Sequence, residues 1–145
     1  MTPDQIIQHL NLIPHPEGGH YRQTWVESPT HGDRPAGTCI YFLLQANELS
    51  HWHRVDATEI WHFYAGAPLI LSLSASDSGP AIAHRLGPDL AAGESPQLIV
   101  PADHWQSARS TGAWTLVGCT VSPGFQFQGF TLAAPGFEIP KLTSR

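Results

Sequence analysis

Three imidazoles and two carboxylates occur within the segment from Ser50 to His62, SHWHRVDATEIWH. His51 and His53 are two positions apart, so in a β-strand both side chains would project from the same face. Glu59 follows a short polar turn, and a hairpin could return its carboxyl to the two imidazoles. Two histidines and one carboxylate on one face suit a divalent Ni, Mn, Fe or Zn ion with open positions for water or substrate.

The same residues could line a pocket without a metal. His-x-His pairs occur often by chance in strands, and an imidazole can act as an acid or a base because its pKa lies near neutrality. Trp61 shares the parity of Glu59, which would place the carboxyl among aromatic side chains, where an unpaired charge is costly. His62 has the opposite parity and is predicted to face outward. The residues alone leave metal binding and metal-free chemistry open.

The start of the chain has the pattern of a short helix, over about residues 3–12. Thr2 is a suitable N-cap, Pro3 fits the first helical position, and Gln5 completes a capping box with Thr2. Apolar residues then recur on one side at helical spacing, as expected for a helix that packs against the rest of the domain.

From about residue 20 to 133 the hydrophobic period is two, and turns rich in Gly and Pro separate the apolar runs. The predicted strands cover residues 21–26, 38–44, 51–53, 59–64, 69–74, 81–86, 97–100, 105–108, 115–121 and 125–132. This pattern predicts an all-β sandwich or barrel of the jelly-roll type in a single domain of 145 residues. The tail after Pro135 has little pattern, and we expect it to pack loosely or fray.

Composition narrows the partners and the location. The net charge is −5 and Lys141 is the only lysine, so nucleic acid is not expected as a partner. No apolar run approaches the roughly 20 residues that span a bilayer, and no signal-peptide pattern is present, so we expect a cytoplasmic protein without a membrane partner. Cys39 and Cys119 lie in apolar runs and are predicted to be buried free thiols. The sequence has no nucleophile elbow, phosphate-binding loop or dinucleotide fingerprint, which removes most hydrolase, kinase and dehydrogenase functions.

Several motifs, in order along the chain, resemble those of the cupin superfamily. The segment His51-x-His53-x5-Glu59-x6-Gly66 is similar to the first cupin motif, and GESPQLIVPADHWQ, residues 93–106, lies where the second is expected. More specifically, HPEGGHYRQTW, VPADHWQSA and VSPGFQFQGFTLA resemble the cupin-5 (DUF985) family over roughly residues 3–135. The resemblance implies a double-stranded β-helix, that is, a jelly-roll or cupin barrel, with a short N-terminal helix.

The resemblance also implies a set of metal ligands, because metal-binding cupins use two His and one Glu from the first motif and one His from the second. Carried over, the first three are His51, His53 and Glu59, and the fourth falls near Gln106. Glutamine is a weaker, neutral oxygen donor, so a site built on it would hold a divalent transition metal more loosely.

Other residues could serve the pocket. The resemblance suggests that Tyr21 and Arg22 lie at the barrel mouth. Arg22 could clamp a carboxylate or phosphate of the substrate, or could instead pair with Glu17 or Glu27. Tyr41 could donate a proton or could pack in the core.

Two tryptophans, Trp61 and Trp105, flank the proposed site in sequence and are the best tryptophan candidates for contact with a ligand. Asp56, in the turn, could orient an imidazole through its second nitrogen.

We expect a cupin that binds a small polar molecule in the barrel mouth and acts as a metal-dependent enzyme through His51, His53 and Glu59. One alternative is a metal-free isomerase or epimerase, similar to the cupin epimerases of sugar nucleotides, with His51 or His53 as the base and Tyr41 as the acid. Another is a non-catalytic binding or storage module. Cupins commonly associate through sheet edges, so we also expect a homodimer.

Overall fold

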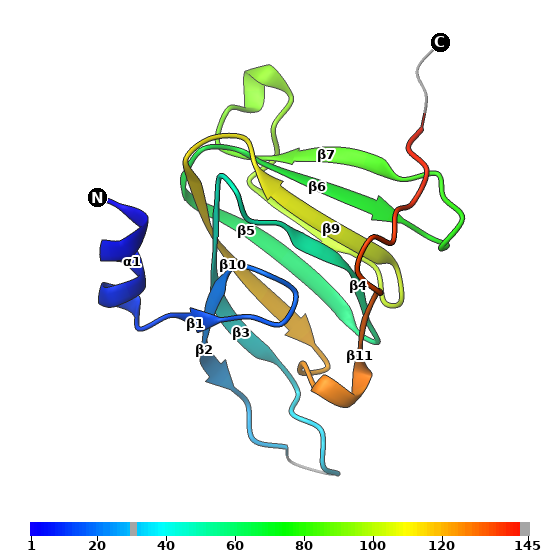
Figure 1. The fold of residues 1–145 in the computed structure, drawn as a ribbon. Helices are drawn as coiled ribbons and strands as arrows, with labels where there is room; N and C mark the ends of the chain where they lie inside the picture. The colour runs from blue at the N-terminus through cyan, green and yellow to red at the C-terminus, as the bar shows by residue number, and fades with distance from the viewer. Residues whose placement is uncertain (30–31, 143–145) are drawn as a thin grey trace.

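Two antiparallel β-sheets pack face to face in the computed structural model, which describes residues 1–29 and 32–142 (Figure 1). One sheet has the strand order β1-β2-β3-β10-β5-β8, and the other has the order β11-β4-β9-β6-β7. The elements are α1 (Pro3–Leu10), β1 (Ile13–Pro14), β2 (His20–Val26), β3 (Thr38–Gln45), β4 (Ser50–Val55), β5 (Thr58–Gly66), β6 (Leu69–Ser74), β7 (Ile82–Leu86), the 3-10 helix η1 (Leu90–Ala92), β8 (Gln97–Val100), β9 (Trp105–Ser110), β10 (Trp114–Ser122), the 3-10 helix η2 (Phe127–Gly129) and β11 (Phe130–Leu132).

Helix α1 begins with the predicted capping box. The Thr2 hydroxyl accepts a hydrogen bond from the Gln5 amide at 3.2 Å, and the Thr2 amide donates to Gln5 Oε1 at 2.8 Å. The helix ends at Leu10, two residues before the predicted end, because Asn11 adopts a left-handed conformation with φ of 54°. Within the described residues, no helix has the length and hydropathy needed to cross a membrane.

The predicted strands are confirmed, apart from the last one. In the segment predicted as a strand over residues 125–132, only Phe130–Leu132 pairs with β4, and Phe127–Gly129 forms a 3-10 turn. The described part of the tail, up to residue 142, packs against the domain and does not fray. Ile139 is buried against the outer side of the five-stranded sheet, and the Ala81 amide donates to Pro140 O at 2.7 Å. Residues 143–145 lie outside the described residues.

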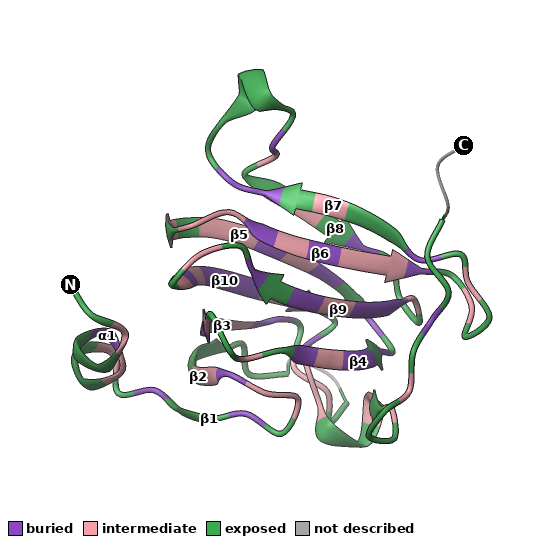
Figure 2. Ribbon diagram, turned by 45° about the horizontal axis from the view of Figure 1, so that its top comes forward, coloured by how far each residue is buried: buried purple, intermediate pink, exposed green. Residues whose placement is uncertain are grey.

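The main core lies between the two sheets (Figure 2). Its fully buried members are Phe42, Leu44, Trp61, Leu69, Leu71, Leu86, Val100, Ala108, Val117 and Cys119. Both cysteines are free, as predicted; Cys119 is buried in this core, whereas Cys39 is half-buried. Alternate residues of each strand supply the core, which is the period that the sequence predicted.

One arginine joins three segments at one end of the sheets. The Arg34 guanidinium makes a two-pronged ion pair with Asp56, at 3.0 and 2.7 Å, and donates through Nε to Gly124 O at 2.9 Å. These contacts connect the segment before β3, the β4–β5 turn and the segment after β10. Asp56 therefore pairs with Arg34. The sequence had suggested that Asp56 orients an imidazole, and that suggestion is wrong.

The loop between β1 and β2 is pinned by a glycine that has no room for a side chain. Gly18 has a φ of +114°, and a Cβ there would meet Leu49 O. We expect Gly18→Ala to lower the free energy of unfolding by about 3 kcal/mol. The alanine would have to adopt a strained positive φ, and the Leu49 backbone would have to move away from its Cβ.

The matched control is Gly93→Ala. Gly93 also has a positive φ, +85°, but open space surrounds its Cβ position. Its substitution should lower the free energy of unfolding by only about 1 kcal/mol. Urea unfolding of the two variants measures the difference, and equal losses would contradict the role given to the Leu49 contact.

Candidate functional site

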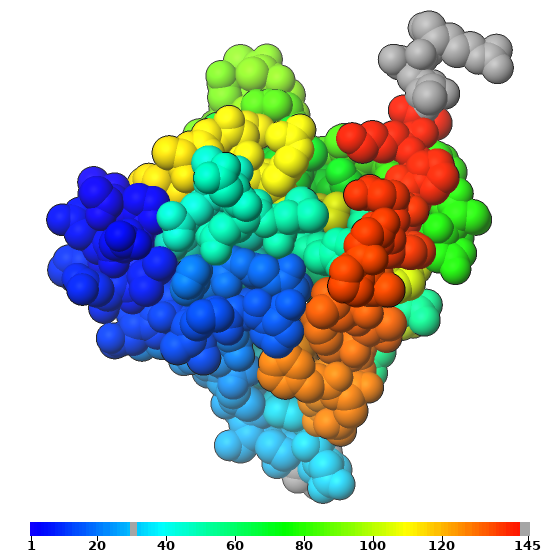
Figure 3. Space-filling view, viewed as in Figure 1, coloured from blue at the N-terminus to red at the C-terminus, as the bar shows by residue number. Residues whose placement is uncertain are grey.

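A cavity of about 100 Å³ opens between the sheets at the end that β2, β3, β4, β5 and β10 share. Its polar lining is His15, Glu17, Gln23, Thr38, His53, Glu59 and Cys119, and its apolar lining is Tyr21, Ile40, Val55, Val121, Phe125 and Phe127. The segment after β10, drawn orange, lies beside the blue β1–β2 segment on the face shown in Figure 3, in agreement with the 6.4 Å between the ring centroids of His15 and Phe127. The cavity is therefore bounded by both sheets and by two loop segments.

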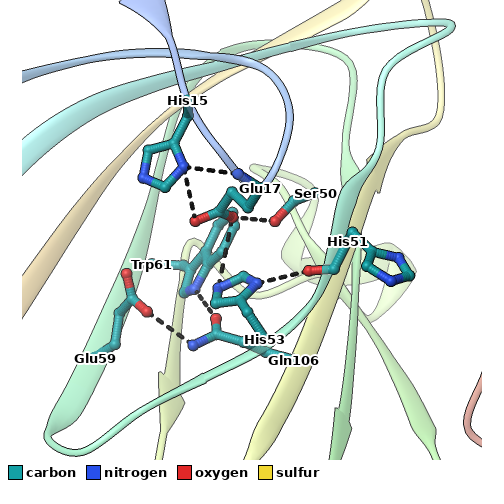
Figure 4. A network of polar contacts seen from close by, with 8 residues as sticks. All are labelled: His15, Glu17, Ser50, His51, His53, Glu59, Trp61 and Gln106. Atoms are coloured by element: carbon teal, nitrogen blue, oxygen red, sulfur yellow. Dashed lines mark hydrogen bonds and ion pairs between the residues drawn. The ribbon is translucent and has the colours of Figure 1, made fainter. Parts of the chain in front are cut away.

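Glu17, on the β1–β2 loop, lies at the centre of the polar network (Figure 4). Its Oε2 accepts a hydrogen bond from the Ser50 hydroxyl and lies 3.5 Å from His53 Nε2, while Oε1 lies 3.4 Å from His15 Nδ1. The side chain is only 9% exposed. Burial raises the pKa of Glu17 to about 8, against the opposing effect of the Ser50 hydrogen bond. At neutral pH this carboxyl is mostly protonated.

His53 presents one nitrogen to the cavity. Its Nδ1 donates to His51 O at 2.7 Å, so the neutral ring has its lone pair on Nε2, the atom that faces Glu17. Burial lowers the pKa of His53, although the nearby Glu59 opposes the shift. His15 is neutral as well, because burial lowers its pKa to about 4. An unprotonated imidazole therefore faces a protonated acid.

Glu59 is held by a buried chain of hydrogen bonds. Trp61 Nε1 donates to Gln106 Oε1 at 2.8 Å, and Gln106 Nε2 donates to Glu59 Oε1 at 2.8 Å. Burial raises the pKa of Glu59 to about 7; the neighbouring His53 and the hydrogen bonds from Gln106 and Cys119 lower it, and Glu17 raises it. Near neutral pH this carboxyl is therefore close to half ionised.

Of the residues predicted from the sequence, His53, Glu59 and Tyr21 line the cavity, whereas His51 does not. The strand register shifts between Ser50 and His53, and the His51 ring turns away to donate from Nε2 to Ala134 O at 2.9 Å (Figure 4). The prediction that His51 and His53 share one face is therefore wrong, because the irregularity breaks the alternation of the strand.

Arg22 and Tyr41 are cross-strand partners on the outer side of the six-stranded sheet. The Arg22 guanidinium lies 5.6 Å from the centre of the Tyr41 ring, and Tyr41 packs beside the helix rather than in the cavity. The cavity positions offered for both residues are wrong, because Arg22 and Tyr41 alternate with the inward-facing Tyr21 and Phe42. Of the two roles offered for Tyr41, the structure shows packing, against the core cluster beneath the helix.

Trp105 packs on the outer side of the five-stranded sheet. Its ring lies 5.0 Å from the Arg54 guanidinium and 5.4 Å from the Phe137 ring. The prediction that Trp105 contacts a ligand in the cavity is therefore wrong. Trp61 and Gln106 are buried behind Glu59, and they act on the cavity through Glu59 rather than by direct contact.

The predicted metal ligands do not form a set that fits a metal ion. His51 points to Ala134, and the carbonyl oxygen of Gln106 already accepts the Trp61 N–H while its amide nitrogen faces Glu59. Across residues 1–29 and 32–142, no three His, Cys, Asp or Glu side chains are grouped so that they could hold one ion. Glutamine here links two buried groups and does not offer a free oxygen.

The sequence analysis missed His15 and Glu17 as cavity residues. They lie in HPEGG, a turn with no strand or helix period that could place their side chains. Two signals were available: HPEGG belongs to one of the motifs that resemble the cupin-5 family, and an acid followed by two glycines indicates a close backbone approach at that point. Ser50 was missed as well, because its hydroxyl takes part in the site only by donating a hydrogen bond to Glu17.

Comparison with protein families covers nearly the whole chain. Residues 4–133 match Cupin_5, described as Cupin superfamily (DUF985). No curated protein matches the chain.

Two solved structures are similar over most of their length. A protein from Shewanella oneidensis is 40% identical with a TM-score of 0.87, and the match covers 92% of this chain and 85% of that one. A hypothetical protein from Leishmania major is 28% identical with a TM-score of 0.86, covering 94% of this chain and 90% of that one.

A more distant match is similar in fold alone. Oxalate decarboxylase from Bacillus subtilis is 11% identical with a TM-score of 0.62, and the match covers 82% of this chain but 29% of that one. These comparisons confirm the predicted jelly-roll fold. The chain belongs to the cupin-5 (DUF985) family of the cupin superfamily.

Proposed function

We propose that this cupin binds a small polar molecule in the cavity and moves protons on it without a metal ion, as an isomerase or epimerase does. The observation that supports the proposal is the pairing of Glu17 Oε2 with His53 Nε2, which lie 3.5 Å apart in one cavity. Their pKa values are displaced in opposite directions, so at neutral pH one holds a proton and the other can accept one.

In the proposed reaction His53 and Glu17 each transfer one proton to the ligand and take one proton from it. His53 Nε2 takes a proton from a carbon next to the carbonyl of the ligand, and Glu17 gives its proton to the carbonyl oxygen. His53 then returns a proton to the neighbouring carbon, or to the opposite face of the same carbon once the bound ligand has turned over, and a ligand hydroxyl returns a proton to Glu17. No electrons are gained or lost overall. The His51 carbonyl keeps Nδ1 protonated and stabilises the imidazolium that forms between the two steps.

The cavity limits what can bind. A single water needs about 10–15 Å³ of such a cavity, so about 100 Å³ holds a molecule of about seven to ten heavy atoms. Among the described lining residues there is no Lys or Arg, and Arg22 lies on the opposite side of its sheet. A phosphate or carboxylate would therefore meet two carboxyl groups and no cation, which disfavours sugar nucleotides and small acids.

Solvent deuterium exchange tests this chemistry without knowledge of the substrate. Small hydroxycarbonyl compounds and their amino analogues, incubated with the chelator-treated protein in deuterium oxide, should gain deuterium next to the carbonyl. We expect His53→Gln to lower the exchange rate at least about a hundredfold and Glu17→Gln about tenfold or more, because each removes a proton carrier. Mass spectrometry of the compounds measures the exchange.

The matched control is His62→Gln, since His62 lies on the outer side of the sheet and hydrogen-bonds Thr120 at 2.9 Å. This variant should exchange at the wild-type rate. Exchange that requires added Zn²⁺, Mn²⁺, Fe²⁺ or Ni²⁺ would contradict the metal-free chemistry. Binding without any exchange would favour a non-catalytic binding module.

Stability should fall as the pH rises from about 6.5 to 8. The folded-state pKa values of Glu17, about 8, and Glu59, about 7, exceed the ordinary 4.5, so the folded chain holds protons that the unfolded chain has released. His15 and His53 have lowered pKa values and act in the opposite direction, but their window ends near 6.5. We expect a loss of about 2 kcal/mol, since each such proton contributes about 1.4 kcal/mol per pH unit.

Chemical unfolding at the two pH values measures this loss. Glu17→Gln should reduce it to less than about half, because the amide has no proton to release. Glu138→Gln, at an exposed carboxyl, should leave it unchanged. An undiminished loss in Glu17→Gln would mean that Glu17 is ionised in the folded protein.

A further inference from the structure

The cavity contains two carboxyl groups and no described side chain that neutralises them. Glu17 is 9% exposed and Glu59 is 7% exposed, and both line the same space. Among the lining residues that the structure describes, none is Lys or Arg. Buried acids are normally paired with a cation or a metal, so this arrangement lacks a positive partner.

The neighbouring imidazoles do not supply that charge. His15 Nδ1 accepts the Glu17 backbone N–H at 3.1 Å, so the nitrogen nearest the Glu17 carboxyl has no proton of its own. His53 directs its Nδ1 proton to His51 O, away from the cavity. Burial lowers the pKa of both rings, which leaves them neutral at physiological pH.

Three aromatic side chains share the lining of the cavity with these acids. Tyr21, Phe125 and Phe127 line it, and the rings of Phe125 and Phe127 meet edge to face with centroids 5.0 Å apart. Phe127 remains 54% exposed, although it is a large apolar side chain. Aromatic faces attract cations, most strongly where water is excluded. Acidic groups and aromatic rings in the lining of one cavity are the two features that a site for an organic cation needs.

We infer that the ligand of this cavity is a small organic cation, an alkylammonium compound whose charged group lies against Glu59 and Glu17 and whose apolar part contacts Phe125 and Phe127. This inference shares its cavity with the proposed function and specifies the charge of the substrate class. A monocation requires only one ionised carboxylate. Glu59 accepts hydrogen bonds from Gln106 and the Cys119 thiol, whereas Glu17 accepts one from Ser50, so Glu59 supplies the charge and Glu17 keeps the proton that the acid step uses.

Other occupants match the cavity less well. An anion would meet the two acids, and an uncharged alcohol would leave the ionised Glu59 without a positive charge to balance it. The described side chains offer no group of three metal-binding residues to an inorganic ion. An alkylammonium group needs no coordination geometry and can donate hydrogen bonds to, or pack against, both carboxyl groups.

Calorimetric titration with pairs of probes that differ only in charge tests the inference. The pairs are choline with dimethylbutanol, in which carbon replaces the nitrogen, and n-butylamine with n-butanol; butyrate serves as the anion. We expect at least one cation to bind about tenfold or more tightly than its uncharged partner, and butyrate not to bind. Glu59→Gln should reduce that preference to about twofold or less, because it removes the charge and keeps the shape.

Two further variants keep the result interpretable. Phe127→Leu, at an exposed position that folding tolerates, should weaken the cation more than the uncharged partner, because it removes the aromatic face alone. Glu138→Gln should retain the full preference. Equal or tighter binding of the alcohols, or no binding of either cation, would overturn the inference, as would tight Zn²⁺ or Mn²⁺ binding that Glu59→Gln abolishes. Deuterium exchange on uncharged hydroxycarbonyl compounds would still support the proposed function in that case.

Discussion

A buried carboxyl group that must find hydrogen-bond donors is the constraint on which this site depends. Glu59 faces the cavity from β5, and its only described side-chain donors are Gln106 and the Cys119 thiol. The carbonyl oxygen of Gln106 in turn needs a hydrogen-bond donor, and the Trp61 N–H is that donor. A glutamine joins an indole donor to a carboxyl acceptor because its amide has one acceptor and one donor end. An imidazole at the same position, with a ring nitrogen at each end, would leave a lone pair for a metal only by giving up one of these partners.

The alternation of strands explains how much of the fold and site could be predicted from the sequence. Nearly all strands, and the inward positions of His53 and Glu59, follow from a period of two and from the cupin motifs. Tyr41 was misplaced because both faces of β3 are apolar, so that period cannot tell its inner side from its outer side. His51 was misplaced because the register shifts between Ser50 and His53, a backbone irregularity that leaves no mark in residue type.

Glu17 could not be predicted for a different reason. Its place depends on a loop whose course is set by tertiary contacts: His51 N donates to Glu17 O at 2.9 Å, and Gly18 passes against the Leu49 backbone. Local sequence patterns describe strands and helices, not the path of an irregular turn. The first cupin motif likewise contains His53 and Glu59 but not the β1–β2 loop. The strand period and the motif therefore both found the base, His53, and the carboxyl of Glu59, and both missed the acid, Glu17.

The energetic state of the cavity is the strongest reason to expect a ligand there. Burial holds the pKa of Glu17 and Glu59 above the ordinary range, so ionising either acid in the folded chain opposes folding. Replacing both with apolar residues of similar size would remove this penalty and would leave the core between the sheets intact. A positive group that enters this cavity would offset the cost of ionising an acid there, which is why we expect a cation rather than an anion. The same acids that weaken the empty protein at higher pH would then strengthen the occupied one.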